Sequence, residues 1–290
     1  MAHLSRRHTM SAVGVAAAAL VGGLATPAVA HRRGPLKRAH AHNDYEHEHP
    51  LFDALSHGFA SVEADIWLVD GHLLVAHDEV DLDPSRTLES LYLDPLFELV
   101  RRNHGSVFRG GRLPLQLLID IKSAGDPTYR ELARHLRRYR PMLTEATRGR
   151  VSTGAVTAVI SGDRAARVPM EEEIASGAVS LAFYDGRLAD LGSGAPASFI
   201  PLISDNWTSS FTWRGEGEFP AEERELLRDL VGRAHAAGQR VRFWETVDVA
   251  GPARDAVWGE LLAAGVDHLN TDDLAGLEDF LRAHDRGRGR

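Results

Sequence analysis

The sequence of 290 residues contains no cysteine, and only two of its 33 basic residues are lysines, Lys37 and Lys122. Without cysteine the chain has no disulfide, no nucleophilic thiol and no thiolate metal site. Positive charge is the minority charge: the formal net charge is -8, which argues against nucleic acid as a partner and against electrostatic adhesion to anionic membranes. Because arginine dominates, the position of Lys122 at the end of an apolar segment predicts a specific role for it.

Long apolar runs are also scarce, and the longest lies within residues 1–30. Arg6 and Arg7 precede an apolar run over residues 11–24, and a small-residue A-x-A sequence ends at Ala30. This order predicts a cleaved secretory signal, and the paired arginines suggest the twin-arginine export route. The run is shorter than the roughly 20 residues of a membrane span. We therefore predict a secreted, extracellular protein without a stable membrane span.

The rest of the chain alternates strand-like and helix-like segments and shows no linker or change of composition. About eight strand-like segments, each followed by a helix or a long loop, match the order and length of a single (β/α)8 TIM barrel. We therefore predict one α/β domain over residues 31–285, with a disordered tail at residues 286–290. The expected strands are residues 36–42, 61–69, 113–121, 155–160, 179–184, 199–203, 240–244 and 267–270. The expected helices are residues 50–57, 87–100, 129–139, 169–176, 222–237, 253–264 and 274–283, with a short helical turn at 185–191.

The second expected strand carries the most informative pattern. Glu63 and Asp65 alternate along it, so both carboxylates project to the same face. Burial of two neighbouring negative charges is costly unless a cation lies between them, which favours a divalent metal. Asp70 and Gly71 then form a strong hairpin signal, and the hairpin is expected to return His77 toward the two carboxylates.

Polar residues follow most of the expected strands at their C-terminal ends, where a TIM barrel holds its active site. Glu63, Asp65 and Asp120 are expected to bring three carboxylates from two strands to one point, and Asn43 could add an amide oxygen. Such hard oxygen ligands suit Mg²⁺ or Ca²⁺ rather than zinc or copper. Polar residues at strand ends also serve as helix N-caps, and this reading stays open for Asp272.

Two histidines and a lysine complete the candidate site. His42 and His77 are predicted to flank the metal as an acid/base pair, because imidazole exchanges protons near neutral pH. Lys122 supplies a fixed positive charge for a phosphate, or alternatively pairs only with Asp120. His40 alternates with His42 and is expected to take a supporting or core position. A metal, a lysine and two histidines can split a phosphodiester without a nucleophilic side chain.

These motifs resemble the signature of the phosphodiesterase superfamily with a phospholipase C-type TIM barrel. The superfamily includes glycerophosphodiester phosphodiesterases, phosphoinositide-specific phospholipases C and sphingomyelinase D-type enzymes. The motifs run over residues 39–122 and are most similar to the group that contains altered inheritance of mitochondria protein 6. The resemblance implies that Trp244 borders the substrate. It also implies that His42 and His77 are the acid/base pair. The metal ligands that it implies are Glu63, Asp65 and Asp120.

The sequence thus predicts a monomeric, metal-dependent phosphodiester hydrolase that acts on a glycerophosphodiester or phospholipid-type substrate. One alternative is a metal hydrolase of the amidohydrolase or PHP type, because His40 and His42 alternate at the end of the first expected strand. A catalytically silent barrel that acts as a binding protein is the other alternative. The aromatic loop at residues 209–220 could contact a membrane or roof the pocket.

Overall fold

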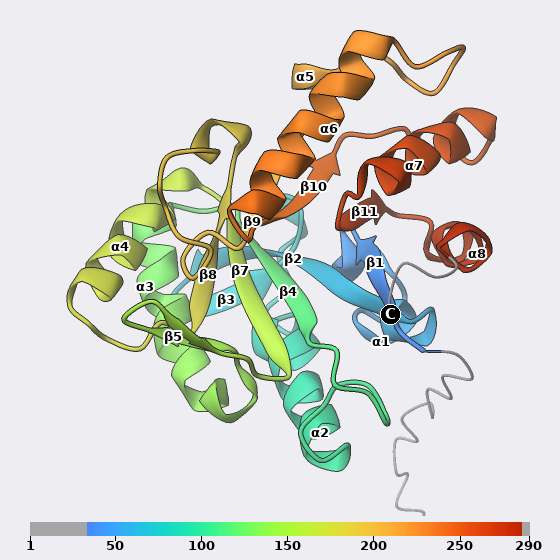
Figure 1. Cartoon of the computed structure of the whole chain (residues 1–290). Helices are drawn as coiled ribbons and strands as arrows, with labels where there is room; N and C mark the ends of the chain where they lie inside the picture. Colours follow the sequence, from blue (N-terminus) through green and yellow to red (C-terminus); the bar gives the residue numbers. More distant parts are fainter. Residues whose placement is uncertain (1–33, 286–290) are drawn as a thin grey trace, which may run out of the picture.

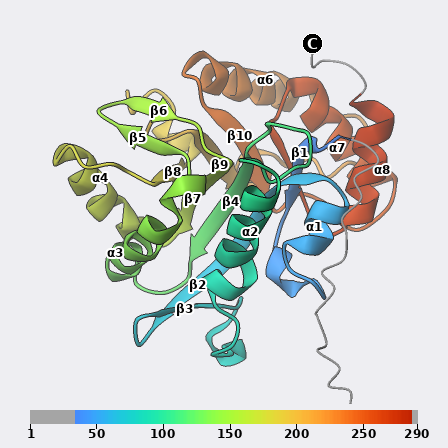
Figure 2. The same ribbon diagram turned by 90° about the horizontal axis from the view of Figure 1, so that it is seen from below.

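The computed structural model describes residues 34–285. These residues form a closed barrel of parallel strands that helices surround (Figures 1 and 2). The barrel closes because β1 pairs in parallel with both β2 and β11. The predicted TIM barrel is therefore confirmed. In their order around the barrel, the strands are β1 (Leu36–Ala41), β2 (Phe59–Val69), β4 (Leu115–Ile121), β7 (Val156–Gly162), β8 (Ala182–Gly186), β9 (Leu202–Asn206), β10 (Arg240–Trp244) and β11 (His268–Thr271).

Helices cover the outside of the barrel, and two short hairpins decorate it (Figure 1). No helix within residues 34–285 is long and apolar enough to cross a membrane. The predicted signal sequence and the predicted tail lie outside the described residues. The helices are α1 (Phe52–Ser56), α2 (Asp94–Arg102), α3 (Gly125–Leu136), α4 (Arg167–Ala175), α5 (Trp207–Ser210), α6 (Ala221–Ala236), α7 (Pro252–Ala264) and α8 (Leu274–His284). The additional strands are β3 (His72–Val75), β5 (Glu145–Thr147) and β6 (Arg150–Ser152).

The hairpin between β2 and β3 forms where the sequence predicts it. Val69 pairs with His72 in an antiparallel register, and the two residues between them have positive φ angles, 49° at Asp70 and 81° at Gly71. An Asp-Gly pair in this conformation matches the twist of the flanking strands. The hairpin places His77 on the side of the barrel where β2 presents Asp65.

Two strand predictions are displaced along the chain. The expected strands at residues 179–184 and 199–203 both start three residues too early, since β8 begins at Ala182 and β9 at Leu202. Phe199 and Ile200 are apolar and buried, but their N–H groups donate to the carbonyl of Pro196 in a turn. Apolar content alone does not distinguish a strand from a buried turn.

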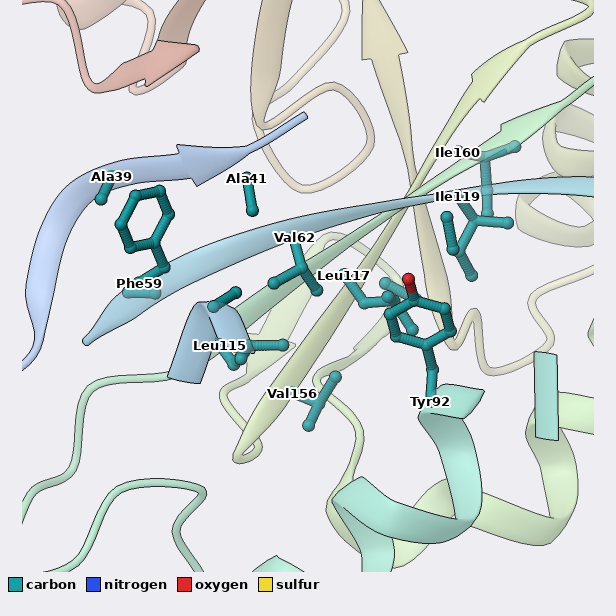
Figure 3. Close-up of a cluster of buried hydrophobic side chains, with 14 of the residues drawn as sticks. Ala39, Ala41, Phe59, Val62, Tyr92, Leu115, Leu117, Ile119, Val156 and Ile160 are labelled. Atoms are coloured by element: carbon teal, nitrogen blue, oxygen red, sulfur yellow. The ribbon is translucent and has the colours of Figure 1, made fainter. Parts of the chain in front are cut away.

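Alternate residues along the strands divide into an outer and an inner set. Outer residues such as Val62, Leu117, Ile119 and Ile160 are fully buried against the surrounding elements, as the close-up with Tyr92 shows (Figure 3). This outer layer is the main hydrophobic core and fixes the strands relative to the helices.

The inner set is different in its two halves. Leu118, Val159, Phe183 and Leu202 alternate with outer residues and form a separate apolar cluster with Ala146. The opposite half of the interior carries buried polar side chains, although TIM barrels usually fill this space with Val, Ile and Leu. The inner set on β1, β2, β4, β9, β10 and β11 includes the buried polar residues His40, Ser61, Glu63, Asp65, Gln116, Ser204, Arg242, His268 and Asn270. Ser161 on β7 and Asp185 on β8, two residues beyond Val159 and Phe183, are buried as well.

Candidate active site

Three carboxylates meet at the C-terminal end of the barrel. Glu63 and Asp65 project from β2, and Asp120 lies directly opposite Asp65 in the parallel pair of β2 and β4. One oxygen atom from each of the three acids lies within 4.8 Å of the others. The structure therefore brings the three acids together as predicted, while their role as metal ligands stays a prediction.

The two oxygens of Asp65 have opposite environments. Oδ2 accepts hydrogen bonds from the Tyr45 hydroxyl at 2.6 Å and from His77 Nδ1 at 3.1 Å, and it lies 3.0 Å from Lys122 Nζ. Oδ1 is buried and has no hydrogen-bond partner among the described residues. A buried carboxylate oxygen without a partner is costly, so this atom has the environment of a metal ligand.

Glu63 is held from below by a buried arginine. Arg242 Nη2 donates to Glu63 Oε2 at 2.7 Å, and His40 Nε2 lies 3.1 Å from the same oxygen. Burial alone would raise the pKa of Glu63, but Arg242 and His40 outweigh burial and hold this pKa well below its ordinary value. Burial and the neighbouring Arg242 lower the pKa of His40 to about 4. His40 is therefore neutral, donates from Nε2 to Glu63, and accepts at Nδ1 from the Ser61 hydroxyl at 2.7 Å.

Lys122 joins the two strands that carry the acids. Its Nζ lies 3.0 Å from Asp65 Oδ2 and 3.1 Å from Asp120 Oδ1. Burial lowers the pKa of Lys122, but Asp120 and Asp65 outweigh burial and raise it. Burial, followed by the charge of Glu63, raises the pKa of Asp65 to about 6 and also raises the pKa of Asp120. Lys122 and Arg242 supply two positive charges for three acids, so the negative charge of the cluster is incompletely compensated.

The donor set fits a divalent cation. It consists of carboxylate oxygens only, three of them converge, and Asp65 Oδ1 is buried without a partner. Hard cations such as Mg²⁺ and Ca²⁺ prefer such oxygen ligands. Asn43 lies beside this set: its Oδ1 is 2.9 Å from the Tyr45 hydroxyl, which also contacts Asp65. Asn43 adopts the left-handed conformation with φ 46°, which asparagine tolerates better than most residues.

Each predicted catalytic histidine is oriented by an acid. His42 Nδ1 lies 2.8 Å from Asp272 Oδ1, and His77 Nδ1 lies 3.1 Å from Asp65 Oδ2. Burial lowers the pKa of His42, but the hydrogen bond with Asp272 and the negative charges of Glu63 and Asp272 together outweigh burial and raise it. Within the described residues, neither Nε2 has a hydrogen-bond partner, and both side chains are partly exposed, 30% for His42 and 51% for His77. Both Nε2 atoms are therefore available to a substrate.

Asp272 does not have the helix-capping role that the sequence left open. The side chain that accepts from the first turn of α8 is Asp273, through the N–H of Gly276. Asp272 instead contacts His42, and its own N–H donates to Asp248. The sequence alone does not show which of two adjacent aspartates at a strand end caps the following helix and which one contacts the site.

Several contacts of the site were not predicted from the sequence. Tyr45 and Arg242 each contact an acid of the cluster, and Asn270 accepts a 2.8 Å hydrogen bond from Arg242 Nε. A signal for Arg242 was present, since an arginine at an alternate position of a barrel strand points inward. Trp244 lies two residues beyond Arg242 on the same face of β10, at the rim of the barrel.

The aromatic side chains of the loop at residues 209–220 are buried. Phe211 and Phe219 are each 1% exposed, and Phe211 stacks on Trp207 with ring centroids 4.0 Å apart. Trp213 stacks on Phe219 at 4.5 Å. These rings therefore form a buried hydrophobic cluster, which corrects the expectation that they contact a membrane, while a role of the loop as a roof of the pocket stays a prediction.

Two parts of the chain match known families. Residues 34–179 match the AIM6-like phosphodiesterase domain, and they include the three acids and both histidines of the candidate site. The chain belongs to the AIM6-like phosphodiesterase family. Residues 240–275 of this AIM6-like protein, which include Arg242 and Trp244, also match the glycerophosphoryl diester phosphodiesterase family. The superfamily predicted from the motifs is thus confirmed.

Comparisons over most of the chain agree with this assignment. The AIM6-like chain is 30% identical over 277 residues to altered inheritance of mitochondria protein 6 from Eremothecium gossypii, which covers 84% of this chain and 69% of the relative. It is 29% identical over 259 residues to the homolog from Arthroderma benhamiae, with 81% of each chain covered. A glycerophosphoryl diester phosphodiesterase structure from Parabacteroides distasonis has a TM-score of 0.51 at 14% identity, covering 86% of this chain and 87% of that chain. This last likeness shows a shared barrel fold.

Proposed function

We propose that this AIM6-like protein is a divalent-metal-dependent phosphodiester hydrolase that acts on a glycerophosphodiester or phospholipid-type substrate. The observation that carries the proposal is a set of converging acids, one with a buried unpartnered oxygen, flanked by two histidines with available Nε2 atoms. Membership of a phosphodiesterase family supports the same reaction class.

The chemistry divides between the cation and the side chains. A bound Mg²⁺ or Ca²⁺, held by Glu63, Asp65 and Asp120, supplies positive charge that stabilises the phosphoryl oxygens. Lys122 adds a fixed positive charge beside it. His42 and His77 move protons at Nε2, one from the attacking hydroxyl and one to the leaving oxygen.

The contacts of His40 count against a binuclear metal hydrolase of the amidohydrolase or PHP type. That reading needs His40 as a metal ligand, but its side chain is fully buried, and both ring nitrogens are occupied, by Ser61 and Glu63. A ligand histidine must offer one free ring nitrogen to the metal. The phosphodiesterase proposal makes no such demand on His40.

The test is a substrate screen with and without EDTA. Purified protein is incubated with glycerophosphodiesters, phosphoinositides and sphingomyelin-type lipids, and products are followed by phosphorus NMR, which also distinguishes hydrolysis from a cyclic product. We expect cleavage of at least one substrate class, loss of activity with EDTA, and recovery with added divalent metal. Activity that is unaffected by EDTA would refute the metal dependence, and no cleavage of any phosphodiester would refute the reaction class. The variant Asp163→Asn, which changes an exposed acid that only caps a short helical turn, should behave like the wild type with and without EDTA.

A further inference from the structure

Each carboxylate of the acid cluster has one oxygen occupied by protein donors and one left over. Glu63 Oε2 accepts from Arg242 and His40, and Asp65 Oδ2 contacts Tyr45, His77 and Lys122. Asp120 Oδ1 is 3.1 Å from Lys122 Nζ. The other oxygens, Glu63 Oε1, Asp65 Oδ1 and Asp120 Oδ2, have no hydrogen bond to any of the residues 34–285.

This division matters for the coordination geometry. Ca²⁺ takes six to eight oxygen ligands in flexible arrangements and often binds both oxygens of a carboxylate. Mg²⁺ requires an octahedron of single oxygens and keeps several waters. We propose that this site selects Mg²⁺ over Ca²⁺ because Arg242 and Lys122 restrict its three acids to one-oxygen coordination. The inference rests on the proposed metal-dependent function and adds the choice of metal and the residues that make it.

The blocking donors are themselves fixed in place. Arg242 is 3% exposed, donates from Nε to Asn270 at 2.8 Å, and lies with Nη1 3.4 Å from Ser204 Oγ. These contacts tie it to β9 and β11 as well as to Glu63 on β2, so the guanidinium cannot swing away to release Oε2. A Ca²⁺ ion that took both oxygens of Glu63 would have to displace this buried cation.

Lys122 blocks two acids at once. Its amino group lies between Asp65 and Asp120, and its stem extends from the end of β4, the strand that carries Asp120. Tyr45 adds a second short contact to the same oxygen of Asp65. Two acids therefore lose one oxygen each to a single ammonium group, and a larger cation gains no extra ligand from either.

The ratio of the two metal affinities separates geometry from charge. Removal of any positive side chain makes the site more negative and strengthens binding of every divalent cation. Only a change in the available oxygens alters Ca²⁺ binding relative to Mg²⁺ binding. The ratio of the two dissociation constants is thus the quantity to measure.

The experiment is calorimetric titration of the purified protein with MgCl₂ and with CaCl₂, independently of any substrate. We expect wild-type protein to bind Mg²⁺ more tightly than Ca²⁺. In Arg242→Met and Lys122→Met the ratio should move toward Ca²⁺ by about tenfold, in line with the effects of residues that orient metal ligands.

Two matched controls remove the same charges elsewhere. Arg240 lies two residues before Arg242 on β10 and contacts His268 at 3.0 Å. Lys37 is the other lysine of the chain and lies on β1. Arg240→Met and Lys37→Met should leave the Mg²⁺ to Ca²⁺ ratio at its wild-type value.

The outcomes are distinguishable. Tighter binding of Ca²⁺ than Mg²⁺ by wild-type protein overturns the inference while leaving metal-dependent hydrolysis intact, and so does an unchanged ratio in a folded Lys122→Met variant. Absence of binding of either ion overturns the proposed metal dependence as well. Circular dichroism checks the fold of each variant. If Arg242→Met does not fold, the partly exposed Lys122 still decides the question.

Discussion

The two halves of the barrel interior differ in the side chains that they bury, which are apolar in one half and mostly charged or polar in the other. Leu118, Val159, Phe183 and Leu202 place an apolar cluster in one half, and these side chains stabilise the fold by burial and need no hydrogen-bond partners. The other half buries charged and polar groups around Glu63 and Arg242, which must satisfy one another at a desolvation cost. A barrel of this kind can fold with an apolar interior throughout. The polar half is therefore best understood as the support of the acid cluster above it.

The largest expected effect comes from the histidines above the polar half. His42→Ala or His77→Ala should lower kcat/KM by about 10²- to 10⁴-fold, because a positioned acid or base is lost, while the melting temperature stays near that of wild type. Steady-state kinetics on a substrate found in the screen and thermal melts measure the two quantities. His72→Ala is the control, since His72 is exposed at the far end of β3. Near-full turnover in either site variant would disprove the acid/base assignment.

In the apolar half, a truncation should change stability and leave the metal site alone. Phe183→Ala removes a ring that is 2% exposed and should lower the free energy of unfolding by about 3–5 kcal/mol. Urea denaturation measures this loss, and calorimetric titration measures Mg²⁺ affinity. Leu226→Ala, at a 40% exposed position, should cost under about 0.5 kcal/mol. A large loss of Mg²⁺ affinity in folded Phe183→Ala would show that the halves are coupled.

The salt bridge of the polar half should behave differently from an apolar contact. Arg242→Met leaves Glu63 buried without its cation and should lower the free energy of unfolding by about 3 kcal/mol in metal-free buffer. The double variant Glu63→Leu/Arg242→Met, which has no buried charge at this position, should regain most of that stability but bind divalent metal poorly. Urea denaturation of the four proteins of the cycle gives the coupling. If the losses of the two single variants simply added in the double variant, Glu63 and Arg242 would have no coupling energy. The instability of Arg242→Met would then not come from the unpaired charge of Glu63.

The smallest effect concerns pH. Burial and the neighbouring Arg240 hold the pKa of His268 well below 6.5, so the folded protein keeps this ring neutral while the unfolded chain binds a proton below pH 6.5. Protonation of the unfolded state removes stability as pH falls, by about 1.4 kcal/mol per pH unit below 6.5, and has no effect above it. His268→Gln should lack this part of the acid destabilisation. Urea midpoints between pH 8 and 5 measure the difference, and parallel curves for both proteins would contradict it.

The local pattern of the sequence predicted much of the site. Alternation placed Glu63 and Asp65 on one face, and the Asp70-Gly71 turn brought His77 back to them. The bounds predicted for β10 match those observed, Arg240–Trp244. Such features depend on neighbours within a few residues, which a sequence displays directly.

Contacts across the barrel could not be predicted in the same way. Glu63 and Arg242 are 179 residues apart, and their contact depends on closure and register of the whole barrel. Both residues are also compatible with solvent-exposed positions. The partner of His42 is Asp272 rather than Asp273 because α8 begins at Leu274 and uses Asp273 as its N-cap. A shift of the helix start by one residue would exchange the two roles.

Closure of the barrel also sets when the site can come into existence during synthesis. The acids and His77 leave the ribosome well before Arg242, Asn270 and Asp272, and β11 must dock beside β1 to complete the ring. A nascent chain therefore carries Glu63 without its arginine partner until β10 has been synthesised. A prematurely terminated product that lacks β10 and β11 should have no site at all, rather than a weakened one.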